Sequence, residues 1–561
     1  MGSLIDVNAE AFDSIILGAG LSGLCTLYHI RKQFPTWRIR VLEAAPNIGG
    51  TWWYNCYPGA RVDTESLSYA FSFDQDIINE WSWKETFSTQ ADMLRYIEFV
   101  AERLDLYRDM QLNTRVKSAN WQDEPRKWLL EDVNGRKYTT RWLISCIGFL
   151  SSPTLPAIPG IESFQGLARH GSNWPHDFDM KRDFGGKRIG VIGTGATGIQ
   201  TIQATAKEPS VKSVHVFQRT ANWAAPLRSE LISPEKMDEL RRDYDRVWDL
   251  CNSTSSGFLH GADPRRTMEV PEEERITFWE KLYAAPGFGK WMGVFSDTYT
   301  NRDANEAYSA FHAKKIRERV KDPVVAESLI PKDHGFGTRR VPLETKYFEV
   351  YNQPNVHLVD LKKTPIERIT PKGILTTDGT QHELDILVFA TGFNAVTGAF
   401  AEIEWLGKDN RPLLGPSEES TGKTERKPMW PDHRPKTFLG LTVTAMPNMF
   451  MVLGPHQPFG NAPRSIEYAV SNVIDLLKFC TEKGYDYAEP TEAAVQEWTD
   501  HVLACSKGSL INEVDSWITG VNKNVKGRTQ RSVVRYTGHM HEYKRRCEAC
   551  KAADWNGMKF A

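Results

Sequence analysis

Two glycine-rich turns of one pattern constrain this chain more than any other feature of its sequence. Each has the spacing G-x-G-x-x-G between a short apolar run and an apolar helical stripe, and the glycines are Gly18, Gly20, Gly23, Gly193, Gly195 and Gly198. In such a strand-turn-helix unit the first glycine permits a tight turn, the second admits a pyrophosphate, and the third lets helix and strand pack closely. The helix N-terminus then stabilises the phosphate charge. The chain is therefore predicted to hold two dinucleotides.

The residue that ends each second strand distinguishes the two units. The run RIRVLE ends in Glu43, twenty residues after Gly23, where a carboxylate accepts hydrogen bonds from both ribose hydroxyls. The run SVHVFQRT instead presents Arg219 and then Thr220, and an arginine pairs with a ribose 2′-phosphate. One charge-assisted hydrogen bond contributes ~1.5–3 kcal/mol, so Arg219 would favour NADPH over NADH by ~10- to 100-fold; the alternative is a solvated surface arginine. We expect a permanently held flavin in the first unit and exchangeable NADPH in the second.

Two further apolar runs predict how the units are connected. WLISCIG, from Trp142, and LDILVFATG, from Leu384, each end in a glycine turn, and we interpret them as the places where the chain passes between nested domains. The predicted fold class is α/β, with two nested Rossmann-like dinucleotide-binding domains and a helical insertion in the NADPH domain. The predicted parts are 1–150 (FAD-binding domain, first part), 151–225 (NADPH-binding domain, first part), 226–335 (helical insertion), 336–390 (NADPH-binding domain, return) and 391–561 (FAD-binding domain, second part, with a mobile loop and a C-terminal segment).

Within the insertion, Ser233-Pro234 is typical of a helix N-cap followed by a first-turn proline. An apolar stripe at helical spacing follows, and its members are Met237, Leu240, Tyr244 and Val247. Such a stripe indicates core packing rather than contact with a cofactor.

Composition excludes several classes of partner. The formal net charge is −2, which gives no electrostatic reason for nucleic acid or an anionic membrane as partner. No apolar run reaches the ~18 residues that a spanning helix needs. The first twenty residues lack a basic region and a cleavage site, so we expect a cytoplasmic protein.

Eight cysteines are scattered along the chain and are typical of reduced thiols in a cytosolic protein. The closest pair, Cys547 and Cys550, follows His539 and His541. A metal or redox site there is one interpretation, and two thiols on one face of a charged helix is the other. We favour the second and predict no metal.

Two longer stretches resemble the fingerprints of a known family. GGTWWYNCYPGARVD, Gly49 to Asp63, and FQGLARHGSNWPH, Phe164 to His176, are similar to the longer and shorter fingerprints of Baeyer–Villiger monooxygenases. The matching positions are Trp52, Tyr57, Pro58, Gly59, Asp63, Phe164, Gly166, His170, Trp174 and Pro175. His176 stands where the family usually has Asp. The resemblance extends from about Phe12 to about Tyr543.

The resemblance implies an oxygenase that uses FAD, NADPH and molecular oxygen. In this family reduced flavin and oxygen form a flavin peroxyanion, which attacks a ketone, and the adduct rearranges to an ester or lactone. Both anions call for a fixed positive charge, which by resemblance is Arg340, oriented by Asp63. Loss of a comparable stabiliser costs ~3–4 kcal/mol. From the residues alone, Arg339-Arg340 is also compatible with a solvated basic pair.

The resemblance also assigns residues to each ligand. FAD contacts are Gly18, Gly20, Gly23, Glu43, Thr51, Trp52, Asp63, Tyr69 and Val116. NADPH contacts are Arg61, Gly193, Thr194, Gly195, Ala196, Thr197, Gly198, Arg219, Thr220, Arg339 and Trp517. Trp517 lies in a polar, glycine-containing loop that suits a lid, although a tryptophan can also anchor such a loop. Phe459 and Asn461 are expected in the ketone pocket. His170 and Trp174 mark the hinge, where His170 is a hinge residue or a satisfied structural histidine.

Three other functions remain open at this point. A flavin monooxygenase that oxidises nitrogen or sulfur would need no arginine at position 340. A pyridine-nucleotide disulfide reductase would need a redox cysteine pair beside the flavin, where only Cys56 lies. A non-catalytic flavin-binding sensor would bind FAD without forming a product. The expected substrate is a small-molecule ketone, with no nucleic acid and no membrane as partner.

Overall fold

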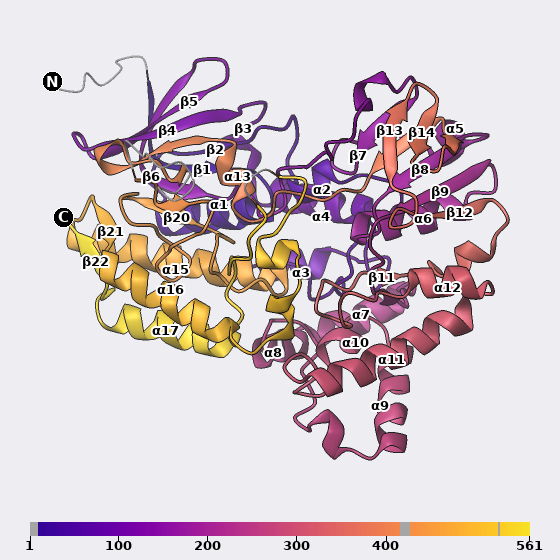
Figure 1. Ribbon diagram of the computed structural model, residues 1–561. Helices are drawn as coiled ribbons and strands as arrows, with labels where there is room; N and C mark the ends of the chain where they lie inside the picture. Colours follow the sequence, from indigo (N-terminus) through magenta and orange to yellow (C-terminus); the bar gives the residue numbers. More distant parts are fainter. Residues whose placement is uncertain (1–8, 416–426, 526–527) are drawn as a thin grey trace.

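The computed structural model describes residues 9–415, 427–525 and 528–561. In Figure 1 the first and last parts of the chain share one lobe, and the middle of the chain forms a second lobe with a helical layer below it. In sequence, the second lobe is therefore inserted between the two parts of the chain that together form the first lobe.

The larger sheet contains the first glycine-rich unit. Its strands run in the order β17-β4-β5-β6-β1-β2-β3, with β20 paired to β6. Their bounds are β1 (Glu10–Leu17), β2 (Ile39–Leu42), β3 (Met110–Gln111), β4 (Val116–Gln122), β5 (Lys127–Asp132), β6 (Lys137–Ser145), β17 (Glu404–Leu406) and β20 (Met449–Met451). β1 is parallel to both β2 and β6, and Ile15 and Ile16 on it are fully buried, as a strand covered on both faces requires.

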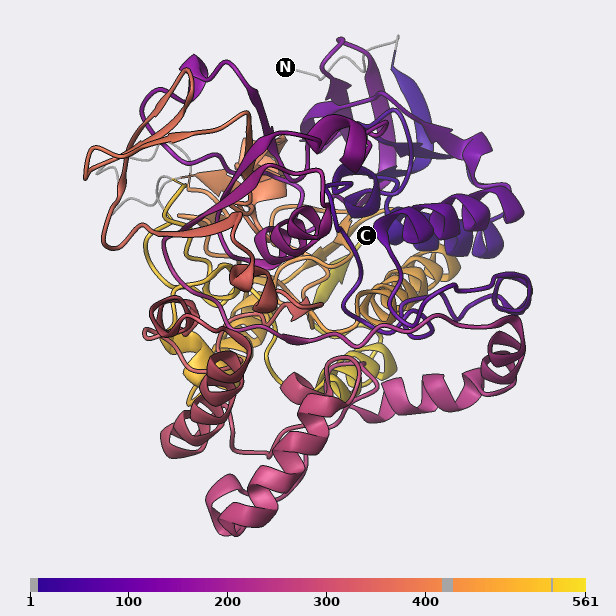
Figure 2. The same ribbon diagram turned by 90° about the vertical axis from the view of Figure 1, so that its right-hand side faces the viewer.

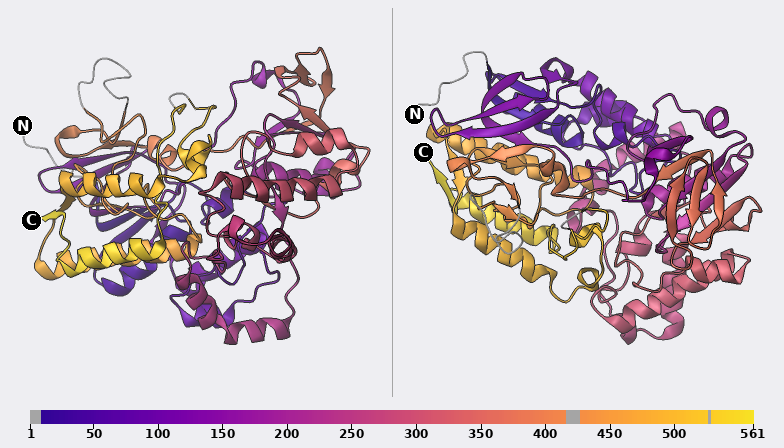
Figure 3. Two further views of the ribbon diagram at one scale, coloured as in Figure 1. Left: turned by 60° about the horizontal axis from the view of Figure 1, so that its bottom comes forward. Right: turned by 45° about the horizontal axis from the view of Figure 1, so that its top comes forward.

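Helices from both ends of the chain accompany this sheet. They are α1 (Leu21–Gln33), α2 (Thr51–Tyr54), α3 (Gln75–Glu80), α4 (Gln90–Arg103), α13 (Gly398–Ala401), α15 (Ala462–Lys483), α16 (Glu492–Ser506) and α17 (Met540–Ala552). α15, α16 and α17 run side by side (Figure 3), and α1 packs on α15. Leu24, Leu477, Trp498 and Tyr543 share one core, so the N-terminal unit is completed by C-terminal helices. The short strands β21 (Ala488–Pro490) and β22 (Met558–Phe560) pair beside them.

The smaller sheet contains the second glycine-rich unit. Its order is β12-β9-β8-β16-β7, with every neighbouring pair parallel. The bounds are β7 (Leu167–His170), β8 (Arg188–Ile192), β9 (Ser213–Gln218), β12 (Val356–Asp360) and β16 (Ile386–Phe389). The helices α5 (Met180–Phe184) and α6 (Ala196–Lys207) belong to this lobe, and an antiparallel meander joins β12 to β16 through β13 (Ile366–Thr370), β14 (Gly373–Thr376) and β15 (Gln381–Glu383).

The two sheets confirm the predicted α/β class with Rossmann-like units. The chain leaves the first sheet after β6, builds the second from β7 to β16, and returns to the first through β17 and β20. We propose residues near 150, 225, 335 and 390 as the domain boundaries. Residues 1–8 of the predicted first part, and 416–426 and 526–527 of the last, lie outside the described residues.

Helices form the insertion and project from the second lobe (Figure 2). They are α7 (Pro234–Arg242), α8 (Tyr244–Ser253), α9 (Glu272–Ala284), α10 (Gly289–Met292), α11 (Arg302–Arg319) and α12 (Pro323–Leu329), and β10 (Ala225–Pro226) pairs with β11 (Leu343–Glu344) at their base. Ser233 caps α7 as predicted, because its side chain accepts a hydrogen bond from the Lys236 N–H. The expected single helix breaks at Asp243, yet Met237, Tyr244 and Val247 are buried on both halves.

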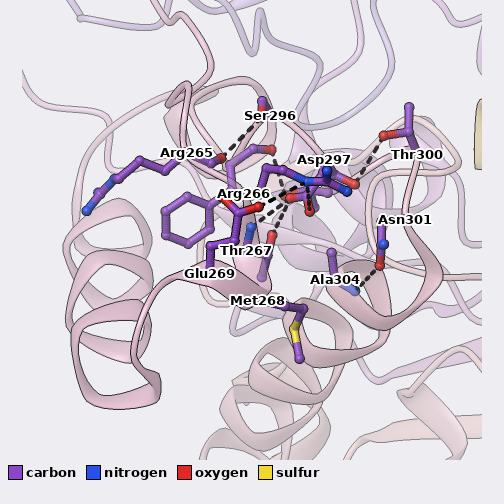
Figure 4. A network of polar contacts seen from close by, with 12 residues as sticks. Arg265, Arg266, Thr267, Met268, Glu269, Ser296, Asp297, Thr300, Asn301 and Ala304 are labelled. Atoms are coloured by element: carbon purple, nitrogen blue, oxygen red, sulfur yellow. Dashed lines mark hydrogen bonds and ion pairs between the residues drawn. The ribbon is translucent and has the colours of Figure 1, made fainter.

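A buried carboxylate anchors the loop of the insertion that precedes α9 (Figure 4). Asp297 accepts hydrogen bonds through Oδ1 from the Thr267 N–H, at 2.8 Å, and from the Thr267 hydroxyl, at 2.7 Å. Arg266 Nε lies 3.7 Å from Asp297 Oδ2. Because each oxygen of this buried acid has a partner, we assign the network a structural role.

The C-terminal cysteines lie on α17. Cys547 is fully buried, and burial raises the pKa of its thiol to about 12. Cys550 donates a hydrogen bond to the Asn556 carbonyl. Within the ranges that the structure describes, no three His, Cys, Asp or Glu side chains are grouped to hold a metal ion, and no helix is long and apolar enough to cross a membrane. The cytoplasmic location stays a prediction.

His456 makes the stability of this fold depend on pH. Its Nε2 lies 3.1 Å from the Val533 carbonyl and its Nδ1 3.2 Å from the Thr437 hydroxyl, which suits the neutral ring. Burial lowers its pKa from 6.5 to about 4. Below pH 6.5 the unfolded chain therefore binds a proton that the folded chain excludes, and stability falls as the pH falls.

We expect this single group to remove about 2 kcal/mol of unfolding free energy between pH 7 and pH 5. The measurement is urea unfolding of the wild type and of His456→Asn at both pH values. The variant is less stable at pH 7 but loses less on acidification, and equal losses in the two proteins would contradict the assignment.

Candidate active site

One cavity of about 2300 Å³ joins both glycine-rich turns. The first turn lines it with Gly18 and Gly20, and the second lines it from Gly193 to Thr197. Residues within 513–525 and 528–531, in the last part of the chain, line the same space. The cavity thus lies between the two sheets, at the carboxyl ends of their central strands, where open α/β sheets bind ligands.

Backbone geometry explains the glycines. Gly18 and Gly193 have φ values of +100° and +108°, which side chains disfavour. A Cβ at Gly23 would lie 1.9 Å from the Gly18 carbonyl oxygen, and one at Gly198 would lie 2.2 Å from that of Gly193. A Cβ at Gly195 instead meets no atom within 4 Å. Gly195 is therefore not needed for packing, and the space beside it is available to a ligand.

The first side of the cavity fits a flavin nucleotide. Glu43 is buried at the cavity wall, and its two carboxylate oxygens accept 2.7 Å hydrogen bonds from the N–H groups of Ala19 and Ala45. Burial raises its pKa, while these two N–H groups oppose the rise. Each oxygen retains a lone pair for a ribose hydroxyl. The predicted flavin residues that line the cavity are Gly18, Gly20, Glu43, Thr51, Trp52, Tyr69 and Val116.

A buried ion pair fixes a guanidinium on the cavity wall. Arg340 Nη1 lies 2.6 Å from Asp63 Oδ2. Asp63 is 3% exposed, and the same oxygen accepts a 3.0 Å hydrogen bond from the Leu343 N–H. Arg340 lines the cavity, whereas Asp63 lies behind it. The arrangement holds a positive charge at the surface of the cavity with its counter-charge shielded from solvent.

Gln200, on α6, is a site residue that the sequence interpretation missed. Its Nε2 lies 3.3 Å from Asp63 Oδ1, and its Oε1 accepts a 2.7 Å hydrogen bond from the Tyr57 hydroxyl. It thus connects the second unit to the carboxylate that holds Arg340. The sequence feature that could have identified Gln200 is a glutamine within the apolar stripe of the helix that follows the second glycine-rich turn.

The second side of the cavity collects cationic groups. Arg219 is exposed, and Arg339 lies 3.7 Å from Asp333; all three line the cavity. Burial lowers the pKa of Arg339, Asp333 opposes this shift, and the nearby charge of Arg219 adds to it. Two arginines that repel each other in this way suit a doubly charged phosphate. Thr194 holds the turn by donating a 2.7 Å hydrogen bond to the Thr220 carbonyl.

Arg61 and Gly198 differ from the other predicted NADPH residues. Arg61 lines the cavity, but its guanidinium lies 2.6 Å from Glu85 Oε2 and donates to the Phe87 carbonyl. Gly198 lies in the interior against the Gly193 carbonyl and not on the wall. Arg61 is therefore already paired with protein groups.

An aromatic cluster lies at the cavity wall beside the loop that contains Trp517. Phe149 stacks on Phe459 with ring centroids 4.8 Å apart, and Trp517 lies 6.3 Å from Phe149. Phe149 and Trp517 line the cavity; Phe459 lies behind Phe149. Asn461, expected in the ketone pocket, is fully buried and donates to the Ser68 carbonyl at 3.0 Å, so it does not line the cavity.

His170 and Trp174, the predicted hinge residues, lie near the passages of the chain between the two lobes. His170, at the end of β7, is 8% exposed, and its Nε2 lies 3.0 Å from the Gly392 carbonyl. Burial lowers its pKa, and the bond to Gly392 opposes that shift. Trp174 is buried, and His176, in place of the usual Asp, stacks on Trp53 at 3.7 Å. His170 is thus a satisfied histidine located where both crossings meet.

Comparison with known proteins places the whole chain among flavoprotein oxygenases. A family model described as flavin-binding monooxygenase-like matches residues 13–238. The chain is 40% identical to 2-oxo-Δ3-4,5,5-trimethylcyclopentenylacetyl-CoA monooxygenase of Pseudomonas putida over 99% of both chains. It is 36% identical to phenazine N-monooxygenase PhzNO1 of Lysobacter antibioticus, over 99% of this chain and 98% of the relative.

Two further similarities cover nearly the full length. A Baeyer–Villiger monooxygenase of Pseudooceanicola batsensis is 34% identical over 98% of this chain and 96% of its own length. The crystal structure of OTEMO in complex with FAD and NADP superposes with a TM-score of 0.90 at 40% identity, covering 99% of this chain and 100% of that one.

Proposed function

The chain belongs to the Baeyer–Villiger monooxygenases, and from that premise we propose that it uses FAD, NADPH and molecular oxygen to convert ketones to esters or lactones. The observation that carries the proposal is the Arg340–Asp63 pair, 2.6 Å apart, at the wall of a cavity shared by both glycine-rich turns. A charge fixed in this way is what the anionic species of the reaction require.

Different residues around the cavity bind the dinucleotide and stabilise the charge that develops in the reaction. The reduced flavin, when bound, supplies the activation of oxygen. The turn at Gly18 and Gly20 and the Glu43 carboxylate hold the dinucleotide. Arg340 stabilises the negative charge that develops on the ketone oxygen, and Asp63 keeps the guanidinium in place. Because both partners are held before reaction, little reorganisation is needed when charge develops.

The residues proposed to bind the second dinucleotide include two positively charged arginines, in contrast to the Glu43 carboxylate on the flavin side. Arg219, Thr220 and Arg339 would receive the 2′-phosphate of NADPH, and the N-terminus of α6 would receive its pyrophosphate. Phe149 and Trp517 would exclude water from the reacting groups beside them.

Arg219→Ala is expected to lower the preference for NADPH over NADH by ~10- to 100-fold, because one charge-assisted hydrogen bond to the 2′-phosphate is lost. The measurement is kcat/KM for each coenzyme at constant ionic strength. Arg545→Ala, which removes an exposed arginine paired with Glu542 on α17, is the control. An unchanged ratio in Arg219→Ala would assign that arginine to the solvated surface.

The activity itself is tested by oxygen-dependent NADPH consumption with linear, cyclic and aryl ketones. Ester or lactone formation is followed by mass spectrometry, with ¹⁸O₂ as the oxygen source. We expect one labelled oxygen atom in the product. Bound FAD that NADPH reduces only slowly, with no oxygen-dependent product from any ketone class, would instead support the non-catalytic sensor.

The phenazine N-monooxygenase relative favours N-oxygenation as a second candidate function. That reaction adds oxygen to a nitrogen lone pair and generates no carbonyl oxyanion, so Arg340 is dispensable for it. Phenazine belongs in the substrate panel, with Arg340→Ala as the discriminating variant. N-oxide formation that survives the substitution would establish the second candidate, and absence of any N-oxide in the wild type would remove it.

A further inference from the structure

Asp333 brings a negative charge to the part of the cavity wall that holds the two coenzyme arginines. Its Oδ2 lies 3.7 Å from Arg339 Nη2, its side chain is 39% exposed, and both residues line the cavity together with Arg219. Arg219 and Asp333 also line a second, smaller cavity of about 480 Å³, so the two side chains share the same surroundings. An anion that enters this region therefore meets a carboxylate as well as two guanidinium groups.

The two consecutive arginines, Arg339 and Arg340, are paired with acids in different ways. Arg340 lies 2.6 Å from Asp63, within hydrogen-bond distance, and the Asp63 side chain is 1% exposed and lies behind the cavity wall. The 3.7 Å between Arg339 and Asp333 is too long for a hydrogen bond, and Asp333 lies on the wall itself. Asp63 thus orients its arginine out of reach of a ligand, whereas Asp333 acts through its charge and faces the ligand.

A buried histidine keeps Asp333 in this place. Its Oδ1 lies 2.8 Å from Nδ1 of His334, whose side chain is fully buried, and the histidine donates because an ionised carboxylate can only accept. The His334 carbonyl in turn accepts a 3.0 Å hydrogen bond from the Trp223 indole N–H. The acid would therefore lose a buried partner if it turned away from an incoming anion.

The charge of Asp333 is not cancelled by this histidine. Burial lowers the pKa of His334, and the nearby charge of Arg339 adds to the shift, so the ring is neutral at pH 7. Burial raises the pKa of Asp333, but the hydrogen bond from His334 and the charge of Arg339 outweigh that effect and hold the pKa below its ordinary value. Asp333 is thus a fixed, ionised acid at neutral pH.

We propose that Asp333 weakens the binding of the NADPH 2′-phosphate and thereby keeps this coenzyme exchangeable. A phosphate monoester carries about 1.5–2 negative charges at pH 7, and a carboxylate fixed beside it lowers the attraction that Arg219 and Arg339 supply. A second acid near Arg339, Asp515, already pairs with Arg531 at 2.8 Å. The inference rests on the proposed assignment of the two arginines to the phosphate, and it does not depend on which substrate is oxidised.

Calorimetry with adenosine 2′,5′-bisphosphate and with 5′-AMP tests the proposal, because the two nucleotides differ only in the 2′-phosphate. In the FAD-loaded enzyme, Asp333→Asn is expected to tighten binding of the bisphosphate by about 5- to 10-fold and to leave binding of 5′-AMP within about twofold. The amide oxygen still accepts from His334, so the fold is retained. Asp333→Glu keeps the charge and the wild-type affinities. Asp238→Asn, which removes an exposed acid paired with Arg241 on α7, is the matched control.

Salt and kinetics give two further readouts that a purely structural role of Asp333 would not change. The gain in Asp333→Asn is expected to shrink at about 1 M salt, where exposed charges are screened beyond ~3 Å. In stopped-flow measurements, dissociation of NADP⁺ from Asp333→Asn is expected to slow by about the same 5- to 10-fold, while dissociation of NAD⁺ stays within about twofold of the wild type.

Arg219→Ala separates this inference from the proposed phosphate site. If Arg219→Ala loses affinity for the bisphosphate and Asp333→Asn gains none, the phosphate site stands and the inference is refuted. Weaker binding in Asp333→Asn would also overturn the inference and would make Asp333 a positioning residue for Arg339. Unchanged binding in Arg219→Ala and Asp333→Asn would refute both. No ketone is present in these measurements, so a failure of ester formation leaves their outcome standing.

Discussion

Arg340→Ala is expected to lower kcat for ester formation by about 10²- to 10³-fold, the usual effect of removing one fixed donor from a developing oxyanion. FAD content is retained, because Arg340 lies at the cavity wall and the flavin side is built from other groups. NADPH is still oxidised, and the electrons appear as hydrogen peroxide. The measurements are product by mass spectrometry, NADPH consumption and peroxide in one reaction mixture.

The fold survives this substitution because Asp63 keeps other partners. The Leu343 N–H and the Gln200 amide still donate to its carboxylate at 3.0 and 3.3 Å. Arg340→Lys retains the charge without the planar fork and is expected to recover only part of the activity. Arg545→Ala controls for the loss of one arginine. Ester formation at the wild-type rate in Arg340→Ala would refute the assigned role.

Gly195→Val is expected to raise the KM for NADPH by about 10²-fold or more, because its side chain would occupy the space through which a pyrophosphate approaches the turn. The unfolding temperature and FAD content stay near the wild-type values, since a Cβ at Gly195 meets no atom within 4 Å. NADP⁺ titration by calorimetry measures the effect directly.

Gly198→Val, in the same turn, is expected to lower the stability of the fold, which Gly195→Val leaves unchanged. A Cβ there would lie 2.2 Å from the Gly193 carbonyl oxygen, so the strand and helix would have to separate and the protein would lose stability. Gly261→Ala, whose nearest contact would be 3.8 Å, is the neutral control. A Gly195→Val protein that binds NADP⁺ normally would show that no dinucleotide passes over this turn.

The parts of this protein that sequence predicts well are those fixed by local backbone chemistry. The two turns needed glycine for positive φ and for close helix packing, and each requirement leaves a spacing that is visible in the sequence. The cap at Ser233 is equally local. The break at Asp243 was not predicted because the apolar stripe continues through it, and tertiary packing decides where such a stripe bends.

Contacts between distant segments were predicted only through family resemblance. No pattern in the sequence indicates that Asp63 contacts Arg340, because the two residues are far apart along the chain. Gln200 was missed for the same reason, because its partners come from the other unit. Asn461 was assigned to the ketone pocket by the same resemblance, and its fully buried side chain donates to the Ser68 carbonyl.

The return of the chain to its first sheet has a consequence for synthesis on the ribosome. β6 lacks its β20 neighbour, and α1 lacks α15, until residues beyond 449 and 462 have been made. The inner unit, from β7 to β16, is complete earlier. We therefore expect the nascent chain to fold from the inside outward, with the N-terminal lobe depending on chaperones until its last helices emerge.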